Sequence, residues 1–245
     1  MEETVKKGIP SNTLKLIAIL LMLTDHFAVV FEREIVSSFA GGEALFVLLR
    51  TLARIAFPLF AFFIAVGAKY TKNIYKYMLR LAAFALLSEI PFDLAFNGAW
   101  LEFSYQNVFF TLLMGLFCIF CWQKLKDTLY GVPAVLIGAG VCALAELVIK
   151  PDYGAMGIVC IVLFYAFMDA PKWVRLIAVP LTCFALSFVV YPFYFNEAEL
   201  FAVAAAPLIL LFNGQKGIKL NRWFFYVFYP AHLLLLWLIH FAVFR

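Results

Sequence analysis

The sequence contains few charged residues. Only 14% of its 245 residues are charged, whereas soluble domains carry about a quarter. Hydrophobic residues make up 66% of the chain, and the mean hydropathy is +0.97. Such a chain lacks the polar surface that a soluble globular fold needs, so this composition excludes one. Its apolar runs are continuous and do not alternate like the strands of a transmembrane barrel, so we expect a helical membrane protein.

All five cysteines lie within apolar runs: Cys118, Cys121, Cys142, Cys160 and Cys183. We interpret them as small hydrophobic residues and not as disulfides. Cys118 and Cys121 share a helix face, but no histidine or further thiol is near them in sequence, so we predict no metal site. The net charge of +4 is a weak guide to partners and gives no reason to expect a nucleic acid.

The apolar runs predict an all-α fold, a polytopic transmembrane bundle of about nine spans. No separate soluble domain or long linker is visible, so residues 1–245 read as one membrane domain. The expected spans are 14–31, 44–66, 79–96, 107–122, 131–149, 154–168, 173–190, 199–212 and 223–244. Two of them, 154–168 and 199–212, are short, and either could be re-entrant, which would change the span count and the side of the C-terminus.

Basic residues orient this bundle. If the connections alternate sides, most of the 19 lysines and arginines fall on the side of the N-terminus. Positively charged loops mark the cytoplasmic side of membrane proteins. The N-terminus is therefore expected in the cytoplasm, with membrane lipids as obligatory partners.

Three pairs of polar or charged residues lie inside the expected spans: Asp25-His26, Arg50 with Arg54, and Glu89 with Asp93. With a rise of about 1.5 Å per residue, all six lie about 6–15 Å below the outer edge. Both like-charged pairs are spaced i, i+4, so each pair shares one helix face. We expect the two arginines to face the two carboxylates across helices. Charges inside membrane spans usually face partners and mark functional sites.

His26 is the residue of this group that titrates near neutral pH. Asp25 points about 100° away from it on a helix, so the partner of His26 is expected from another span. Beside arginines the imidazole should stay neutral, and a neutral imidazole can act as a general base. Two plainer interpretations stay open. The charges can serve only to lock the helices together, and a backbone carbonyl can satisfy His26.

Further polar residues border the same level of the bundle: Asn107, Thr111, Asp152, Tyr153 and His232. His232 is a second histidine candidate, or it satisfies a carbonyl near the Pro230 kink. Basic residues also gather in two loops on the expected cytoplasmic side: Lys72 and Lys76 in one, and Lys216, Lys219 and Arg222 in the other. They either contact anionic lipid or bind a phosphate-rich cofactor.

Seven segments, in family order over nearly the whole chain, resemble the TraX family: LKLIAILLMLTDH (Leu14 to His26), RIAFPLFAFFIAVG (Arg54 to Gly67), RLAAFALLSEIPFDLAF (Arg80 to Phe96), NVFFTLLMG (Asn107 to Gly115), DYGAMG (Asp152 to Gly157), FNGQKG (Phe212 to Gly217) and FFYVFYPAHL (Phe224 to Leu233). The named member of that family is implicated in N-terminal acetylation of pilin. The family is similar to membrane acyltransferases that use cytoplasmic coenzyme A.

This resemblance implies acetyl-CoA as the donor and the bacterial inner membrane as the location. It leaves the acceptor open between a pilin-like protein and a surface glycan or lipid. The motif matches carry these positions over as candidate functional residues: Asp25, His26, Arg54, Glu89, Asp93, Asn107, Asp152 and His232.

Together these observations predict a membrane acetyltransferase. His26 would take a proton from the acceptor's amine or hydroxyl, and Asp25, Glu89 or Asp93 would orient the imidazole. Arg54 or Asn107 would stabilise the oxyanion. Arg50, Thr111, Asp152, Tyr153 and His232 would border the substrate. The basic residues of the two loops would hold the nucleotide of the donor.

Two other classes of function are compatible with the same charges. A transporter or flippase would use them as a substrate or proton path through broken helices. A non-catalytic partner in the assembly of a surface structure would use them only to fix the bundle.

Overall fold

In a computed structural model, the chain is described over residues 7–189 and 194–244. Its elements are α1 (Ser11–Val30), α2 (Glu32–Ser38), α3 (Gly42–Ala53), α4 (Ala56–Tyr70), α5 (Ile74–Phe96), α6 (Val108–Leu125), η1 (Leu129–Gly131), α7 (Val132–Leu144), η2 (Ala145–Ile149), α8 (Gly154–Phe167), α9 (Lys172–Ala185), β1 (Phe188–Val189), β2 (Tyr194–Phe195), η3 (Glu197–Ala204), α10 (Ala205–Leu210) and α11 (Arg222–Phe244). The two short strands pair antiparallel. The predicted all-α class is confirmed.

Five segments of the described chain are long and apolar enough to cross a membrane: Ser11–Val30, Gly42–Tyr70, Val108–Leu125, Leu129–Ile149 and Arg222–Phe244. The expected count of nine spans is therefore not confirmed. The run 154–168 forms a helix of 14 residues. The run 199–212 forms mostly the 3-10 helix η3 and the short α10. Helix α9 ends at Ala185, and residue 190, the expected end of its span, lies outside the described residues.

The expected span 44–66 is divided into α3 and α4 at Arg54 and Ile55. Here the backbone tightens, because the N–H groups of Arg54 and Ile55 bond to the carbonyls three residues earlier, at 3.2 and 3.4 Å. Proline has no N–H, so Pro58 cannot donate to the carbonyl of Arg54 as an α-helix requires. The break sets Arg54 at the end of α3, where the chain passes from the mostly exposed α3 into the buried α4.

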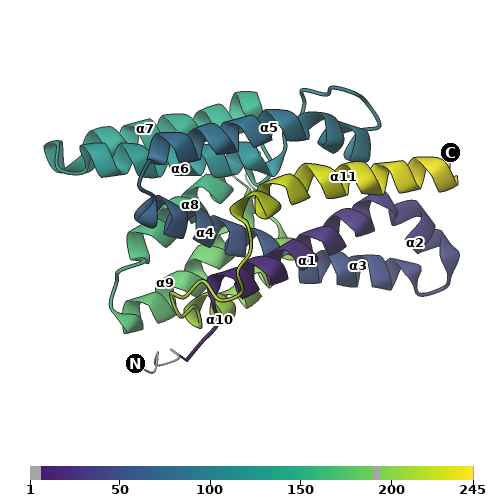
Figure 1. Ribbon diagram of the computed structural model, residues 1–245, viewed down its shortest axis with the longest axis horizontal. Coiled ribbons are helices and arrows are strands. Elements are labelled where there is room, and N and C mark those ends of the chain that lie inside the picture. The colour runs from purple at the N-terminus through teal and green to yellow at the C-terminus, as the bar shows by residue number, and fades with distance from the viewer. Residues whose placement is uncertain (1–6, 190–193, 245) are drawn as a thin grey trace.

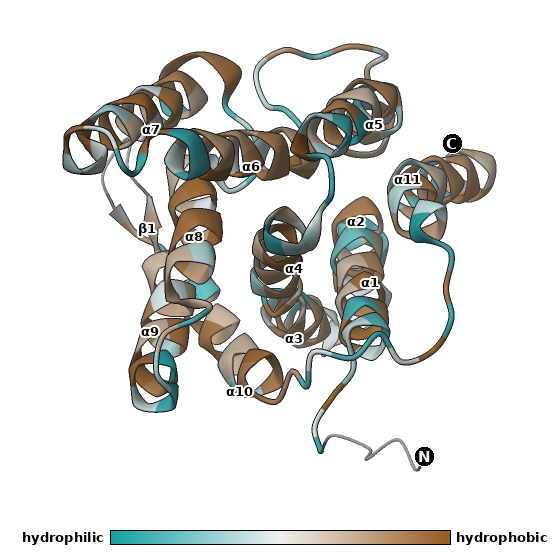
Figure 2. Ribbon diagram, turned by 60° about the vertical axis from the view of Figure 1, so that its left-hand side comes forward, coloured by the Kyte–Doolittle hydropathy of each residue, from teal (hydrophilic) through white to brown (hydrophobic). Residues whose placement is uncertain are grey.

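Helix α4 lies at the centre of the bundle, with α1, α6, α8 and α10 packed around it (Figures 1 and 2). Helix α7 lies at one edge and packs against α6 and α8, and its outer surface is hydrophobic (Figure 2). Large apolar side chains stay exposed there, among them Val135 and Leu136. A lipid environment suits this surface, whereas water would not.

Two glycines bring α6 and α8 together. A Cβ at Gly115 would lie 2.5 Å from the side chain of Ile161, and one at Gly157 would lie 2.7 Å from that of Thr111. Small residues permit such close helix packing in membranes. This close packing places the start of α8 beside the N-terminal half of α6, where several of the predicted site residues lie.

Candidate functional site

His26 on α1 and His232 on α11 form a buried pair. The Nδ1 atom of His26 lies 2.6 Å from Nε2 of His232, and the rings are nearly parallel with centroids 4.9 Å apart. Nδ1 of His232 lies 2.7 Å from the carbonyl oxygen of Phe228. The prediction that the partner of His26 comes from another span is confirmed, and the partner is the second histidine candidate.

This chain of contacts assigns the protons. A carbonyl oxygen only accepts, so Nδ1 of His232 must carry the hydrogen that bonds to Phe228. In the neutral ring, Nε2 of His232 then has the lone pair and accepts from Nδ1–H of His26. The lone pair of His26 consequently lies on Nε2, which is the arrangement of a general base.

The bond between His232 and Phe228 does not repair the proline kink. Pro230 withholds its bond from the carbonyl four residues earlier, which belongs to Tyr226 and not to Phe228. The bond to Phe228 instead fixes the tautomer of His232. A backbone carbonyl was one expected partner of His26. In the structure it is His232 that contacts a backbone carbonyl, that of Phe228.

The two arginines pair with Asp25 and Glu199. Oδ1 of Asp25 lies 2.7 Å from Arg50 and 2.5 Å from Arg54, and the second Nη of Arg54 lies 2.7 Å from Glu199. Nε of Arg54 donates to the carbonyl of Arg50 at 3.1 Å. The predicted pairing of the arginines with Glu89 and Asp93 is therefore wrong.

The cause of this difference is the position of the neighbouring helices. The α3–α4 segment packs against α1 and η3, which supply Asp25 and Glu199, whereas α5 packs mainly against α6 and α11. Sequence reasoning placed Glu199 at the edge of a short apolar run and missed it. A lone acid beside such a run was the available signal.

Glu89 and Asp93 organise the start of α6 and the loop before it. Glu89 accepts from both the backbone N–H, at 3.1 Å, and the side chain of Asn107. Asp93 accepts from the Asn97 side chain at 3.0 Å and from the backbone N–H of Glu102 at 2.8 Å. Neither carboxylate is hydrogen-bonded to His26, and Asp25 pairs with the two arginines instead. The expectation that Asp25, Glu89 or Asp93 orients the imidazole is therefore wrong, and His232 does so.

Asp152 joins the loop before α8 to the rest of the site. Thr111 donates to its carbonyl, and the hydroxyl of Tyr105 donates to its carboxylate at 2.5 Å. Burial raises the pKa of Asp152 to about 6, against the opposing effects of the Tyr105 hydrogen bond and the nearby Arg54 charge. The neighbouring Tyr153 stacks on Phe57 with centroids 3.7 Å apart. The effect of Arg54 on the pKa of Asp152 indicates that these two side chains lie within electrostatic range of each other.

Tyr229 on α11 is a further residue that sequence reasoning missed. Its ring is 3% exposed and meets the rings of His26 and His232 edge-on, with both centroid distances 5.7 Å. It also contacts Phe109 on α6, at 5.1 Å. Its place three residues before His232 on the same helix was the available signal.

The basic residues expected to bind the donor lie on the surface: Lys72, Lys76, Lys216, Lys219 and Arg222 are all exposed. The loop that carries Lys216 is fastened to the start of α1, since the N–H groups of Ser11 and Asn12 donate to the carbonyls of Gln215 and Lys216 at 2.8 and 3.1 Å. None of the five lines the cavity of about 300 Å³ between α4, α8, α9 and α10, whose charged residues are Lys69, Asp169 and Arg175.

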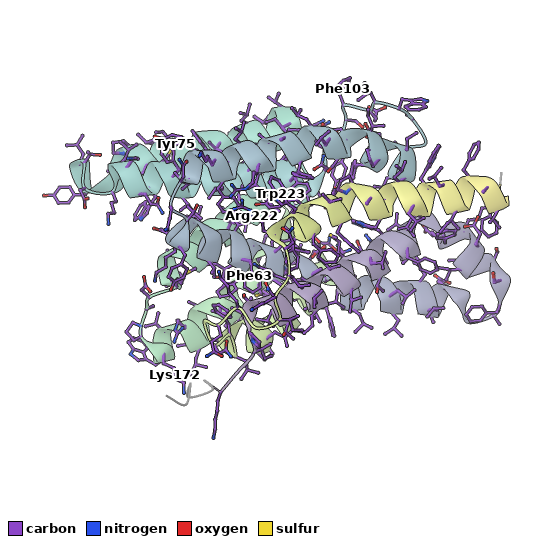
Figure 3. The ribbon with its side chains drawn as sticks, viewed as in Figure 1. Phe63, Tyr75, Phe103, Lys172, Arg222 and Trp223 are labelled. Atoms are coloured by element: carbon purple, nitrogen blue, oxygen red, sulfur yellow. The ribbon has the colours of Figure 1, made fainter. Side chains whose placement is uncertain are left out.

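Lys15 points into the bundle near this loop. Its ammonium lies 5.0 Å from the ring centroid of Phe63 and 5.3 Å from that of Phe225, which are cation–π distances. Phe63 and Arg222, labelled in Figure 3, mark this region of the bundle. Lys15 precedes His26 by 11 residues, so the two share a face of α1 about 16 Å apart.

Among the described residues, no group of three histidine, cysteine, aspartate or glutamate side chains could hold a metal ion. All five cysteines are free thiols, and each is buried except the half-buried Cys142.

Comparison with known proteins supports the resemblance seen in the motifs. The profile of the TraX protein family matches residues 11–240. The chain belongs to the TraX family. It is also 28% identical over 240 residues to the probable fimbrial assembly protein FimC, serogroup H1, of Dichelobacter nodosus, covering 91% of this chain and 92% of that protein. No solved structure matches. Membership of the TraX family and the apolar helices together make this a membrane protein.

Proposed function

We propose that this TraX protein is a multi-pass acetyltransferase of the bacterial inner membrane. It moves an acetyl group from cytoplasmic acetyl-CoA to an amine or hydroxyl of an acceptor. The observation that carries this proposal is the His26–His232 pair, which leaves the lone pair of His26 on Nε2 in a buried setting. A neutral imidazole with a fixed tautomer is suited to general base catalysis.

The reaction balances with His26 as the only proton carrier. The acceptor's amine or hydroxyl attacks the thioester carbonyl carbon and gives its proton to Nε2 of His26. The tetrahedral intermediate then collapses, and the carbon–sulfur bond breaks. The proton passes from His26 to the departing sulfur, which leaves as free coenzyme A. His232 stays bound to Phe228, so Nε2 of His26 is unprotonated again before the next cycle.

The donor's charged nucleotide stays at the cytoplasmic end in this proposal, because phosphates are too costly to bury in a bilayer. Lys216 on the exposed loop and Lys15 beneath it supply positive charge there. The distance of about 16 Å from Lys15 to His26 along α1 is one that a slender pantetheine arm can bridge.

The acceptor is proposed to be a pilus-subunit-like protein. This part of the proposal is supported by the fimbrial assembly name of the Dichelobacter nodosus relative. The same name also supports a second candidate, a non-catalytic assembly partner in which the cluster of Asp25, Arg54 and Glu199 only fixes the bundle.

Labelled acetyl transfer in membrane vesicles separates the two candidates. Vesicles containing the protein receive acetyl-CoA with a radiolabelled acetyl group, and the label is followed into the protein, glycan and lipid fractions. The wild type should transfer the label, and the His26→Ala variant should not. His240→Ala is the matched control, because His240 lies on the same helix as His232 but contacts Glu34 at 3.3 Å, away from the pair. The catalytic proposal would be contradicted if the wild type transferred no label. Full transfer by a folded His26→Ala protein would contradict it as well.

A further inference from the structure

The hydroxyl of Tyr229 is buried, and among the described residues its hydrogen has no acceptor, although the backbone N–H of Val108 lies close enough to donate to its oxygen. Leaving a phenol hydroxyl unpaired in an apolar interior is unfavourable, and buried polar groups nearly always have a partner. This one belongs to a ring packed against both histidines of the pair. An unsatisfied donor beside a general base calls for an acceptor that is present only during the reaction.

The side chains expected to stabilise the oxyanion are already engaged. The amide nitrogen of Asn107 donates to both Glu89 and the Ala85 carbonyl, and its oxygen accepts from the N–H of Phe109. Each nitrogen of the Arg54 guanidinium donates to Asp25, Glu199 or the carbonyl of Arg50. Asn107 cannot reach a new oxygen without breaking a buried bond, and Arg54, which uses three of its five N–H donors, is held in place by its two carboxylate partners and the Arg50 carbonyl. A donor on a ring that contacts both histidines, as Tyr229 does, is therefore the better placed to serve an oxyanion that forms beside His26.

We propose that the Tyr229 hydroxyl is this donor and forms the binding subsite for the acetyl carbonyl of the thioester. This inference rests on the acetyltransferase function proposed above. As the acceptor attacks and His26 takes its proton, the carbonyl oxygen gains negative charge and accepts a hydrogen bond from Tyr229. The phenol keeps its own proton, and the bond weakens again when the carbon–sulfur bond breaks and the carbonyl re-forms.

The surroundings of Tyr229 hold the hydroxyl ready for this role. Phe109 on α6 packs against its ring at 83°, and the two histidine rings meet it at 76° and 73°. A donor fixed in this way needs no reorganisation when charge develops, which is the source of its catalytic effect. Thus the unpaired hydroxyl is unfavourable for the resting protein and useful in the transition state.

Tyr229→Phe tests the proposal, because it removes only the hydroxyl. In the vesicle assay, kcat should fall about 100-fold or more, the usual effect of losing one oxyanion donor, with KM for acetyl-CoA unchanged. The unfolding midpoint in detergent should stay the same or rise, because the variant loses an unsatisfied buried group. Tyr226→Phe, one turn earlier on α11 and packed against Phe84, is the matched control and should keep wild-type kcat.

The possible outcomes are distinct. If the wild type transfers no acetyl group, the proposed function fails and this inference fails with it. If the wild type is active and Tyr229→Phe is equally active, the inference alone is overturned. A lower unfolding midpoint together with lost activity also overturns it, since the hydroxyl would then be stabilising the resting structure. Loss of kcat at an unchanged or higher midpoint supports it.

Discussion

His232 determines which nitrogen of His26 is available to a substrate. Because its Nδ1 hydrogen goes to the carbonyl of Phe228, its Nε2 can only accept, and Nδ1 of His26 must donate. A residue that acts in this way positions the base without contacting the substrate. Its contribution should depend on its ability to accept a hydrogen bond rather than on its charge.

Two substitutions at His232 test this role. His232→Leu removes the acceptor, so His26 can adopt either tautomer, and we expect kcat of acetyl transfer to fall about 100-fold. His232→Gln offers an amide oxygen to Nδ1–H of His26 and should restore most of this loss, with KM for acetyl-CoA similar in both. Initial rates in vesicles measure both effects. Equal losses in the two variants would show that His232 serves packing alone.

Asp152 should make stability depend on pH. Its pKa is about 6 in the folded protein and 3.8 in its ordinary state. The folded protein therefore keeps a proton that the unfolded chain releases, so the contribution of Asp152 to stability is present below about pH 4 and lost as the pH rises through about 6. Asp152→Asn does not titrate and can still accept from Tyr105.

The measurement is the unfolding midpoint of wild type and Asp152→Asn in detergent across this pH range. The midpoint of the wild type minus that of the variant should decrease between about pH 4 and pH 6 and then level off. A difference that stays constant would mean that Asp152 has its ordinary pKa in the folded protein, and one that increases with pH would mean that folding lowers this pKa; either result would contradict the prediction.

The residues of the site could be predicted from sequence better than their partners. Charged and polar residues inside apolar runs identified Asp25, His26 and Arg54, because burying such groups is costly. Helical spacing gives the direction of a side chain on its own helix but not the neighbouring helix it meets. The pairing of His26 with His232 and of Arg54 with Glu199 depends on packing between distant segments, which one sequence does not display.

At the scale of elements, the glycines of the α6–α8 contact fix the position of Asp152. Gly157 lies against Thr111, Tyr153 and Phe57, so Gly157→Ala would push its methyl group into the stack of Phe57 and Tyr153. We expect this overpacking to cost about 1–3 kcal/mol. The unfolding free energy in detergent measures it.

Gly138→Ala on α7 is the control for this prediction, because nothing lies within 4 Å of the added methyl group. Alanine is the better helix former by about 1 kcal/mol, so this variant should be as stable as the wild type or more stable. If the two substitutions changed the unfolding free energy equally, the close contact of α6 and α8 would not be what limits the size of the side chain at residue 157.

The elements themselves were predictable where apolar runs are long. The predicted spans 14–31, 107–122 and 223–244 correspond to α1, α6 and α11 within a few residues. The division of 44–66 at Arg54 was not predicted, although Pro58 was visible. A proline tells which carbonyl is left free but not whether the helix bends or breaks, since that depends on packing around it.

At the scale of the whole molecule, α1 and α11 run in the same direction. The backbone of Ser11 bonds to Gln215 just before α11, while Glu34 and His240 meet beyond the other end of α1. His26 lies four residues before the end of α1, so it is about 6 Å from that end. The side of the membrane that this end faces decides which side supplies the acceptor.

Cysteine labelling in intact cells tests this orientation. We expect Glu43→Cys, on the exposed first turn of α3, to react with a membrane-impermeant maleimide from outside. Lys216→Cys should react only after permeabilisation, because basic loops stay in the cytoplasm. The wild type gives the background, which should be low because four of its five cysteines are buried. The reversed pattern would place His26 near the cytoplasmic face, where the donor's thioester would reach it without crossing the bundle, and the acceptor would then have to be a cytoplasmic molecule.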